Sequence, residues 1–346
     1  MESKHLSYFK VENFKRFDSL EVKDIAQFNL IVGDNNVGKT SLLEALLFDD
    51  EDYDVFLDNL LLALDSREIE INTTQINYLN FYFNDLNKPL TYTYRYSNNN
   101  EKNELKLIER LKNELTKEEI ENLGAHLRLY NSNHLVKFSL NNTDEIRLLK
   151  VDYDTENSYF PFISFKMNYE GIDIELFSKI SLSTQKLEKL KKEMEYFVPN
   201  LTSIEINNAI IPKQLMIAIR ESTSDVAKPL TQYGDGALKL FRYLLEFEFC
   251  ETGRLMIDEI DAGIHYSRMK DFLKKVLQSA KNKNVQIFAT THSKECLGYY
   301  TQALQELGFE NDGRIIRIAN TKSGIKAYTI QFDEFESALY AENEIR

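Results

Sequence analysis

The chain has 346 residues, of which 43% are hydrophobic and 28% charged, and its formal net charge is −13. This composition is typical of a globular protein, and the excess of acids argues against a chain that coats DNA along its whole surface. No apolar run is long enough to span a bilayer, and no signal peptide is recognisable, so we expect a cytoplasmic protein without membrane contact. The two cysteines, Cys250 and Cys296, predict neither a zinc site nor a disulfide framework.

The N-terminal part of the chain is predicted to contain short strands and one helix. Alternating apolar residues indicate strands, and an apolar run from Thr40 indicates a helix. The acidic run after this helix is interpreted as a solvated loop. The strands are expected at 6–12, 19–25 and 28–33, and the acidic loop at 48–54.

The middle of the chain, 51–199, is predicted to form an inserted lobe of strands and short helical elements. Aromatic alternation indicates its strands, and two charged amphipathic segments indicate helices that are too short for a long coiled coil. The strands are expected at 76–85, 90–97, 134–140 and 160–177, and the helices at 103–127 and 183–197.

The last third of the chain returns to a strand–helix–strand pattern. Strands are expected at 201–209, 253–261 and 285–293, a helix at 267–281, and a closing hairpin at 313–320 and 324–332. A further helix is predicted after 236, because Ala237, Leu240, Phe241 and Leu244 recur at helical spacing. We therefore expect one discontinuous domain, 1–50 and 200–346, which the lobe at 51–199 interrupts.

A glycine-rich segment, GDNNVGKTS, fits the pattern G-x-x-x-x-G-K-[ST] and lies between an apolar strand and a helix. That context is typical of a phosphate-binding loop, in which backbone N–H groups surround the phosphates of a nucleotide. Lys39 is predicted to meet the β- and γ-phosphates, and the Thr40 hydroxyl to ligate Mg²⁺. The predicted nucleotide contacts of this loop are Gly33, Asn35, Asn36, Val37, Gly38, Lys39, Thr40 and Ser41.

Two acids follow the apolar strand in RLMIDEID at 254–261. Ligands of open α/β sheets bind at the carboxyl ends of the strands. Asp258 is predicted to hold Mg²⁺, and Glu259 to polarise the water that attacks the γ-phosphate. A solvated acidic strand end is the alternative, and the presence of a phosphate loop in the same chain disfavours it.

His292 ends another apolar strand, IFATTHS at 287–293. An isolated histidine is often structural, but its place after a parallel-type strand favours a catalytic role. We predict that it hydrogen-bonds the γ-phosphate or the attacking water.

The combination of motifs distinguishes between classes of phosphate-loop protein. A small GTPase needs an N-K-x-D motif, and NTKSG at 320–324 lacks the aspartate. A nucleotide kinase needs neither the Asp–Glu pair nor the histidine strand. Over 5–50 and 200–335 the chain resembles ABC-type ATPases, in particular the branch that contains RecF, SMC proteins and the overcoming-lysogenization-defect (OLD) ATPases.

The resemblance implies an α/β fold of the P-loop NTPase class. It implies an ABC-type ATPase head with a mixed central sheet, an N-terminal antiparallel β subdomain and an inserted α+β lobe. ATP and Mg²⁺ are the implied cofactors. The turn VENFKRF further implies that Lys15 approaches the phosphates of the nucleotide.

The stretch YGDG at 233–236 resembles the signature loop of these ATPases in a G-D-G variant. In this family two copies pair head to tail, and the signature loop of one copy binds the γ-phosphate held by the other. The resemblance therefore assigns Gly234, Asp235 and Gly236 to the nucleotide of a partner copy, with Thr231 nearby.

Three further residues have predicted roles around these loops. A carboxylate repels a γ-phosphate, so Asp235 is expected to cap the following helix through the N–H of Leu238 or Lys239, or to bond the loop of the partner copy. His265, in the loop after the acidic strand, is expected to be structural or to lie at an interface. Gln75 is a candidate for the glutamine that senses Mg²⁺ in this family.

Three functions follow from this pattern. The first is an ATP-driven dimer that switches a separate effector, a TOPRIM-type nuclease or a toxin, in an antiphage defence system. The second is a RecF/SMC-like ATPase of DNA repair that binds DNA. Its candidate DNA contacts are Lys186, Lys189, Lys191 and Lys192. The third is a nuclease within the lobe.

The nuclease hypothesis depends on four acids in the lobe. A TOPRIM domain has a glutamate before a D-x-D pair, whereas here the D-x-D pair precedes the glutamate. We therefore interpret these acids as solvated strand faces. They are Asp152, Asp154, Glu170 and Asp173.

Overall fold

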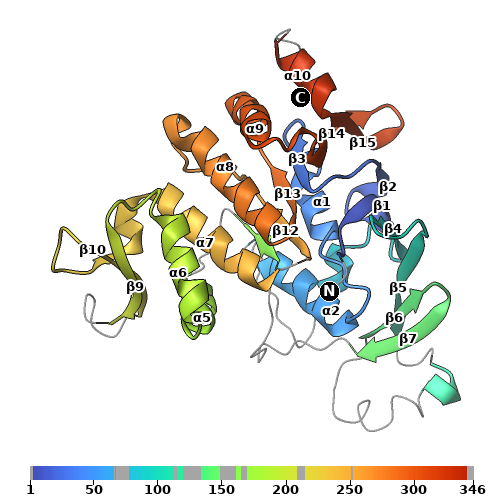
Figure 1. Cartoon of the computed structure of the whole chain (residues 1–346). Coiled ribbons are helices and arrows are strands. Elements are labelled where there is room, and N and C mark those ends of the chain that lie inside the picture. The colour runs from blue at the N-terminus through green and yellow to red at the C-terminus, as the bar shows by residue number, and fades with distance from the viewer. Residues whose placement is uncertain are drawn as a thin grey trace.

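The computed structural model describes residues 3–65, 67, 78–111, 115–119, 134–148, 161–164, 170–208, 215–250 and 252–340. Within these residues the strands form three sheets, two of six strands and one of three (Figure 1). No helix of the described residues is long and apolar enough to cross a membrane.

The central sheet has the strand order β15-β14-β3-β13-β12-β8. Its strands are parallel from β14 to β8, and only the edge strand β15 is antiparallel to its neighbour. The carboxyl ends of β3, β12 and β13 therefore meet at one edge of the sheet, where ligands of such sheets bind. The strands are β3 (Phe28–Val32), β8 (Phe162–Ile163), β12 (Arg254–Ile257), β13 (Gln286–Thr290), β14 (Gly313–Thr321) and β15 (Gly324–Gln331).

The second sheet is antiparallel throughout, in the order β2-β1-β4-β5-β6-β7. Strands β4 to β7 come from 51–199, so this segment shares a sheet with the N-terminal strands. It also contributes β8 to the central sheet. The predicted boundaries of the inserted lobe stay a prediction, but hydrogen-bonded pairing crosses them. The strands are β1 (Leu6–Phe14), β2 (Phe17–Val22), β4 (Leu90–Tyr96), β5 (Asn103–Leu111), β6 (His134–Leu140) and β7 (Thr143–Leu148).

The remaining elements are a small antiparallel sheet and the helices. The small sheet has the order β11-β10-β9, and in Figure 1 it lies with α5 and α6 at the opposite side of the molecule from β5 to β7. Its strands are β9 (Leu201–Asn207), β10 (Met216–Glu221) and β11 (Lys228–Pro229). The helices are α1 (Lys39–Ala45), α2 (Tyr53–Asp65), α5 (Glu170–Ser181), α6 (Thr184–Met194), α7 (Asp235–Phe249), α8 (Tyr266–Asn282), α9 (Lys294–Leu307) and α10 (Phe332–Tyr340), with short 3₁₀ turns at Tyr78–Phe81, Leu230–Tyr233 and Glu310–Asp312.

The central sheet separates two hydrophobic cores, because side chains alternate between the faces of a strand. On β12, Leu255 and Ile257 join the core beneath α5 to α9, whereas Met256 joins the core beneath α1, α2 and the second sheet. On β13, Ile287 and Phe288 divide in the same way. Both faces of these strands are therefore apolar, as a buried parallel sheet requires.

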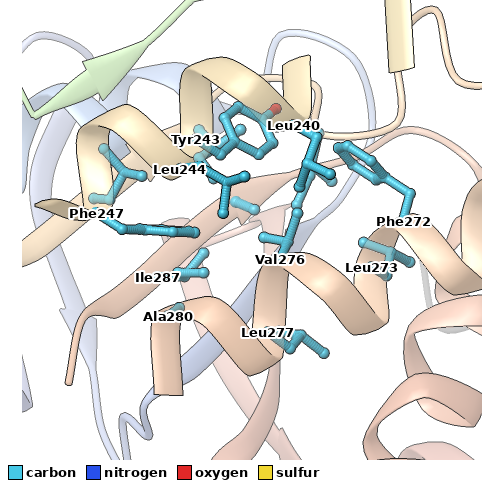
Figure 2. Packing of buried hydrophobic residues seen from close by; sticks show 14 of the residues in the cluster. Leu240, Tyr243, Leu244, Phe247, Phe272, Leu273, Val276, Leu277, Ala280 and Ile287 are labelled. Atoms are coloured by element: carbon cyan, nitrogen blue, oxygen red, sulfur yellow. The ribbon is translucent and has the colours of Figure 1, made fainter. Parts of the chain in front are cut away.

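Helix α7 packs its apolar face against α8 and β13, as its helical spacing predicts. Figure 2 shows Leu240 and Leu244 of α7 above Val276 and Ala280 of α8, with Ile287 of β13 beside them. The predicted signature loop precedes α7 directly, so this packing places the start of α7 relative to the strand that ends at Thr290.

Most elements predicted from the sequence are confirmed, but several in the middle segment are wrong. The expected helix at 103–127 begins as strand β5, because its Leu105 and Leu107 enter the core when β5 pairs with β4 and β6. Of the expected strand at 160–177, the described residues 161–164 contain β8 at Phe162–Ile163, and those from 170 onward begin helix α5. Tyr78–Phe81 is a 3₁₀ turn where a strand was expected. Tertiary pairing overrides local propensity in these segments.

The acidic run at 48–54 is not simply a solvated loop. Phe48 is buried, and the Asp50 carboxylate accepts hydrogen bonds from the hydroxyls of Tyr94 at 2.6 Å and Tyr96 at 2.8 Å. The run therefore fastens the start of α2 to strand β4.

A buried ion pair joins α5 to α7. The Arg242 guanidinium donates to both oxygens of Asp173, with 2.6 Å between Nε and Oδ1, and the two side chains are 9% and 5% exposed. The interpretation of Asp173 as a solvated acid is therefore wrong. Removing one partner would leave the other as an uncompensated buried charge.

We predict that Asp173→Ala lowers the free energy of unfolding by about 3–5 kcal/mol, because Arg242 is left buried and unpaired. Urea unfolding measures this change. The matched control is Glu175→Ala on the same helix, which breaks an exposed pair with Lys179 and is expected to cost about 0.5 kcal/mol. The double variant Asp173→Leu/Arg242→Met should recover most of the loss. Equal costs for both single alanine variants would contradict the prediction.

Candidate functional site

The glycine-rich loop lies between β3 and α1. At two of its positions the backbone conformation favours glycine. Gly33 has φ +146°, and a Cβ there would lie 2.2 Å from the carbonyl oxygen of Ile318 on β14. Gly38 has φ +102°, and a Cβ there would lie 2.7 Å from the ring of Phe17. Close packing against β14 and β2 therefore fixes both ends of the loop, as a cradle for phosphate requires.

Lys39 is held inside this loop. Its ammonium donates to the carbonyl oxygens of Gly33 at 2.7 Å and Asp34 at 2.8 Å, and the residue is 6% exposed. The positive charge is thereby placed within the curve of the loop, where a bound phosphate chain would meet it.

Thr40 and Asp258 converge from two different elements. The Thr40 hydroxyl, in the first turn of α1, lies 3.2 Å and 3.3 Å from the two carboxylate oxygens of Asp258 at the end of β12. Mg²⁺ prefers oxygen ligands, and in nucleotide sites it takes one or two from the protein and the rest from phosphates and water. This pair of oxygen donors beside the loop fits that ion. Among the described residues no cluster of three or more His, Cys, Asp or Glu forms a metal site of another type.

Thr290, at the end of β13, binds both the Asp258 carboxylate and the backbone of Glu259 at the end of β12. Its hydroxyl donates to Asp258 Oδ1 at 2.6 Å and accepts from the backbone N–H of Glu259 at 2.8 Å. Glu259 has φ +51°, a left-handed conformation that costs a non-glycine residue about 1–2 kcal/mol. The sequence analysis missed this threonine, although the Thr290–Thr291 pair before His292 was a signal of hydroxyls at the strand end.

His292 lies beside the phosphate loop. It is exposed and lines a cleft of about 140 Å³ together with Gly33, Asp34 and Asn35 of the loop and Ser293. The structure thus brings the histidine and the loop to one cleft, as the sequence predicts from the ends of two strands. Its proposed contact with the γ-phosphate stays a prediction.

A second set of polar contacts joins the loop after β12 to the residue after β13 and to α7. The Thr291 hydroxyl donates to Asp261 Oδ1 at 2.6 Å, and the Lys239 ammonium donates to the Glu259 carbonyl oxygen at 3.4 Å. Burial lowers the pKa of Lys239, while Asp261, Asp235 and Glu259 oppose that shift. Lys239 therefore links the helix behind the signature loop to the backbone of Glu259.

The signature loop is exposed at the start of α7. Gly234 has φ +83°, and a Cβ there would have open space around it. The expectation that Asp235 caps α7 is wrong. Gly234 is the N-cap residue, with its carbonyl accepting from the Leu238 N–H at 3.2 Å, and no side chain caps this end. The Asp235 carboxylate instead packs on the backbone of Gly263, in the loop after β12.

Lys15 is paired with a buried acid rather than held beside the phosphate loop. Its ammonium binds Glu44 on α1, whose other oxygen binds Arg67. Burial lowers the pKa of Lys15 to about 8, and Glu44 opposes that shift. The predicted approach of Lys15 to phosphate stays a prediction, and it would require this pair to break.

The other candidate residues divide into three groups. His265 has a structural role, because it caps α8 by accepting from the Ser267 N–H at 3.4 Å. Three of the four candidate DNA-binding lysines, Lys186, Lys189 and Lys191, lie in ion pairs with acids. Gln75, Asp152 and Asp154 lie outside the described residues, as does the side chain of Glu170.

With this geometry in view, comparisons with known proteins identify the family. Residues 28–297 match the family described as "AAA domain, putative AbiEii toxin, Type IV TA system". The chain belongs to this family. The match runs from β3, before the phosphate loop, to α9, after His292.

Two individual proteins support the assignment. An "ATP/GTP phosphatase" of Helicobacter pylori is 24% identical, over 97% of this chain and 97% of the relative. A crystal structure of an SMC head bound to the C-terminal winged-helix domain of ScpA is 13% identical, with a TM-score of 0.50 over 96% of this chain and 99% of that chain. The fold is thus that of an SMC-like ABC ATPase head. The predicted class, an ABC-type P-loop ATPase of the RecF/SMC-like branch, is confirmed.

We predict that Thr290→Val lowers kcat for ATP hydrolysis and raises the Mg²⁺ concentration for half-maximal activity, each by about 10-fold, the usual effect of losing a group that orients a metal ligand. The reason is that Asp258 and the Glu259 N–H both lose their partner. Steady-state kinetics across a magnesium titration measures both quantities.

Two variants control this experiment. Thr290→Ser keeps the hydroxyl and should retain most of the activity. Thr301→Val removes another buried threonine hydroxyl, which donates to Leu297 on α9, and should leave the magnesium dependence unchanged. A normal magnesium dependence in Thr290→Val would contradict the orienting role.

Proposed function

We propose that this ATPase is a switch protein that dimerises head to tail around two Mg²⁺–ATP and controls a separate effector, a nuclease or a toxin, in an antiphage defence system. The observation that carries the dimer is the position of Gly234–Gly236. This loop is exposed, has open space around Gly234, and does not line the cleft beside its own chain's phosphate loop.

In the proposed nucleotide site, each residue of the strand edge has one task. Lys39 and the backbone of the loop bind the phosphates, and Thr40 and Asp258 hold Mg²⁺, which would neutralise charge on the β- and γ-phosphates. Glu259 orients the attacking water and accepts its proton, and His292 hydrogen-bonds the γ-phosphate. The support for these roles is that Thr40 lies within hydrogen-bonding distance of Asp258 at the end of β12, and that His292 lines one cleft with the phosphate loop.

The proposed dimer places the signature loop of one copy on the γ-phosphate of the other. Two backbone features favour an anion there: Gly234 leaves the first N–H groups of α7 without a side-chain cap, and α7 is a helix of 15 residues. The Asp235 carboxylate lies against Gly263 in the loop after β12, which leaves the backbone N–H groups at the start of α7 as the donors for phosphate.

The proposed switch also needs a route from one site to the other. Within one chain, α7 carries the signature loop at its start and Lys239 one turn later, and Lys239 binds the carbonyl of Glu259. A nucleotide bound through the partner's loop would therefore bear on the position of Glu259. This route supports coupled hydrolysis at the two sites.

The effector is proposed to be a separate chain. Asp173 is one of the four acids on which the nuclease hypothesis depends. Both of its carboxylate oxygens accept hydrogen bonds from Arg242 in a buried pair, so they do not face a substrate. The family description names a putative toxin of a Type IV TA system, which supports a role alongside a toxin in the proposed defence setting. The alternative of a DNA-binding repair ATPase is less well supported, because three of the four candidate lysines on α6 are paired with Glu248, Glu193 and Glu188.

We predict that Glu259→Gln traps an ATP-bound dimer, because the variant binds nucleotide but activates water poorly. Light scattering coupled to size exclusion, with ATP and Mg²⁺, should give the mass of two chains, and ADP should give one. Adding Lys39→Ala to this variant is the control and should return the monomer. A monomer of Glu259→Gln at saturating ATP would overturn the switch model.

Mixing two inactive variants tests whether the site is shared. Lys39→Ala removes phosphate binding, and Gly234→Glu places an acid in the loop. The added Cβ would meet open space, whereas the φ of +83° strains the backbone of any other residue there by about 1–3 kcal/mol. Each variant alone should lack hydrolysis, whereas the mixture should regain activity, since a heterodimer contains one intact phosphate loop facing one intact signature loop. No recovery, with both variants folded by circular dichroism, would contradict a composite site.

A further inference from the structure

Two adjacent cations, Lys15 and Arg16, occupy the turn between β1 and β2, and the structure distinguishes between them. Lys15 is committed to the protein interior. It binds Glu44, a carboxylate that is 0% exposed, and its own side chain is 13% exposed. Its φ is +50°, and its backbone N–H donates to the Tyr82 carbonyl at 2.6 Å.

The Lys15–Glu44 pair has a structural task. Glu44 lies on α1, one turn after Thr40, and Arg67 from beyond α2 binds its second oxygen. The Lys15 ammonium also lies 4.5 Å from the centre of the Tyr82 ring. Withdrawing Lys15 would leave a buried carboxylate with one partner fewer, which is strongly unfavourable. Lys15 therefore fastens α1 to the β1–β2 turn.

Arg16 has the opposite environment. It is exposed, and its guanidinium makes no ion pair or hydrogen bond within the part of the chain that the structure describes. Its Cδ lies 3.6 Å from the place of a Cβ on Gly38, in the phosphate loop. The next residue, Phe17, is buried with its ring against Gly38, so the base of the Arg16 side chain is anchored at the loop.

The chemistry of Arg16 complements that of Lys39. Lys39 is directed to the β- and γ-phosphates, whereas the backbone around Gly38 belongs to the part of the loop that cradles the α- and β-phosphates. A guanidinium is always charged and binds phosphate oxygens through two parallel donors. We propose that Arg16, rather than Lys15, is the second cation of the nucleotide site and binds the α- and β-phosphates. This inference rests on the proposed nucleotide site.

The test is the affinity of the full chain for ADP and ATP, measured by calorimetry with Mg²⁺. Arg16→Gln should weaken both nucleotides by about 10-fold, the effect of losing one charge-assisted contact. The loss should be equal for ADP and ATP, because both carry the α- and β-phosphates. Its melting temperature should stay that of the natural chain, since Arg16 is exposed.

Two comparisons make the result specific. Lys179→Gln removes one positive charge from α5, which packs on the other face of the central sheet from α1, and should leave both affinities unchanged. Lys15→Met should lower the melting temperature and weaken ADP less than Arg16→Gln does. An unchanged ADP affinity in Arg16→Gln, or a larger loss in Lys15→Met, would overturn the inference. If the natural chain itself bound neither nucleotide, the proposed function would fail instead.

Discussion

The contact between Thr40, Asp258 and Thr290 is the interaction on which the rest of the site depends. It joins the helix after the phosphate loop to the ends of two strands that are far apart in sequence. It exists because β3, β12 and β13 run parallel and end at one edge of the central sheet. One threonine hydroxyl then satisfies an acid and the N–H of the next residue, so that Asp258 and Glu259 share a single support.

The helices on one face of the sheet also contact this edge. Helix α7 packs on α8 and β13, and it carries both the signature loop and Lys239 (Figure 2). The same helix is tied to α5 by the buried Asp173–Arg242 pair. A displacement of the signature loop would therefore act on the acidic strand end and on the lobe of α5 and α6. That arrangement suits a protein in which nucleotide binding alters a surface elsewhere.

The opposite face of the sheet holds the phosphate loop in place. Phe17 packs on Gly38, and Lys15 and Arg67 bind Glu44, so the turn between β1 and β2 and the end of α2 both bear on α1. The Glu44 carboxylate at the centre of this network is 0% exposed. The network separates two neighbouring cations, of which one stabilises the fold and the other remains available to a ligand.

The sequence alone was sufficient for the motifs that are local. The spacing of Gly33, Gly38, Lys39 and Thr40 predicts a phosphate loop, and buried strands that end in Asp258 and His292 predict partners at the same edge, because the backbone geometry of each motif is encoded within a few residues. Prediction from the sequence failed where pairing between distant parts of the chain determines the structure. Strand β5 was expected to be helical, because its pairing with β4 and β6 could not be read from the local pattern, although both of those strands were expected. The burial of Asp173, the commitment of Lys15 to Glu44 and the role of Thr290 were decided only by the tertiary structure, because each depends on a partner brought from a distant part of the chain.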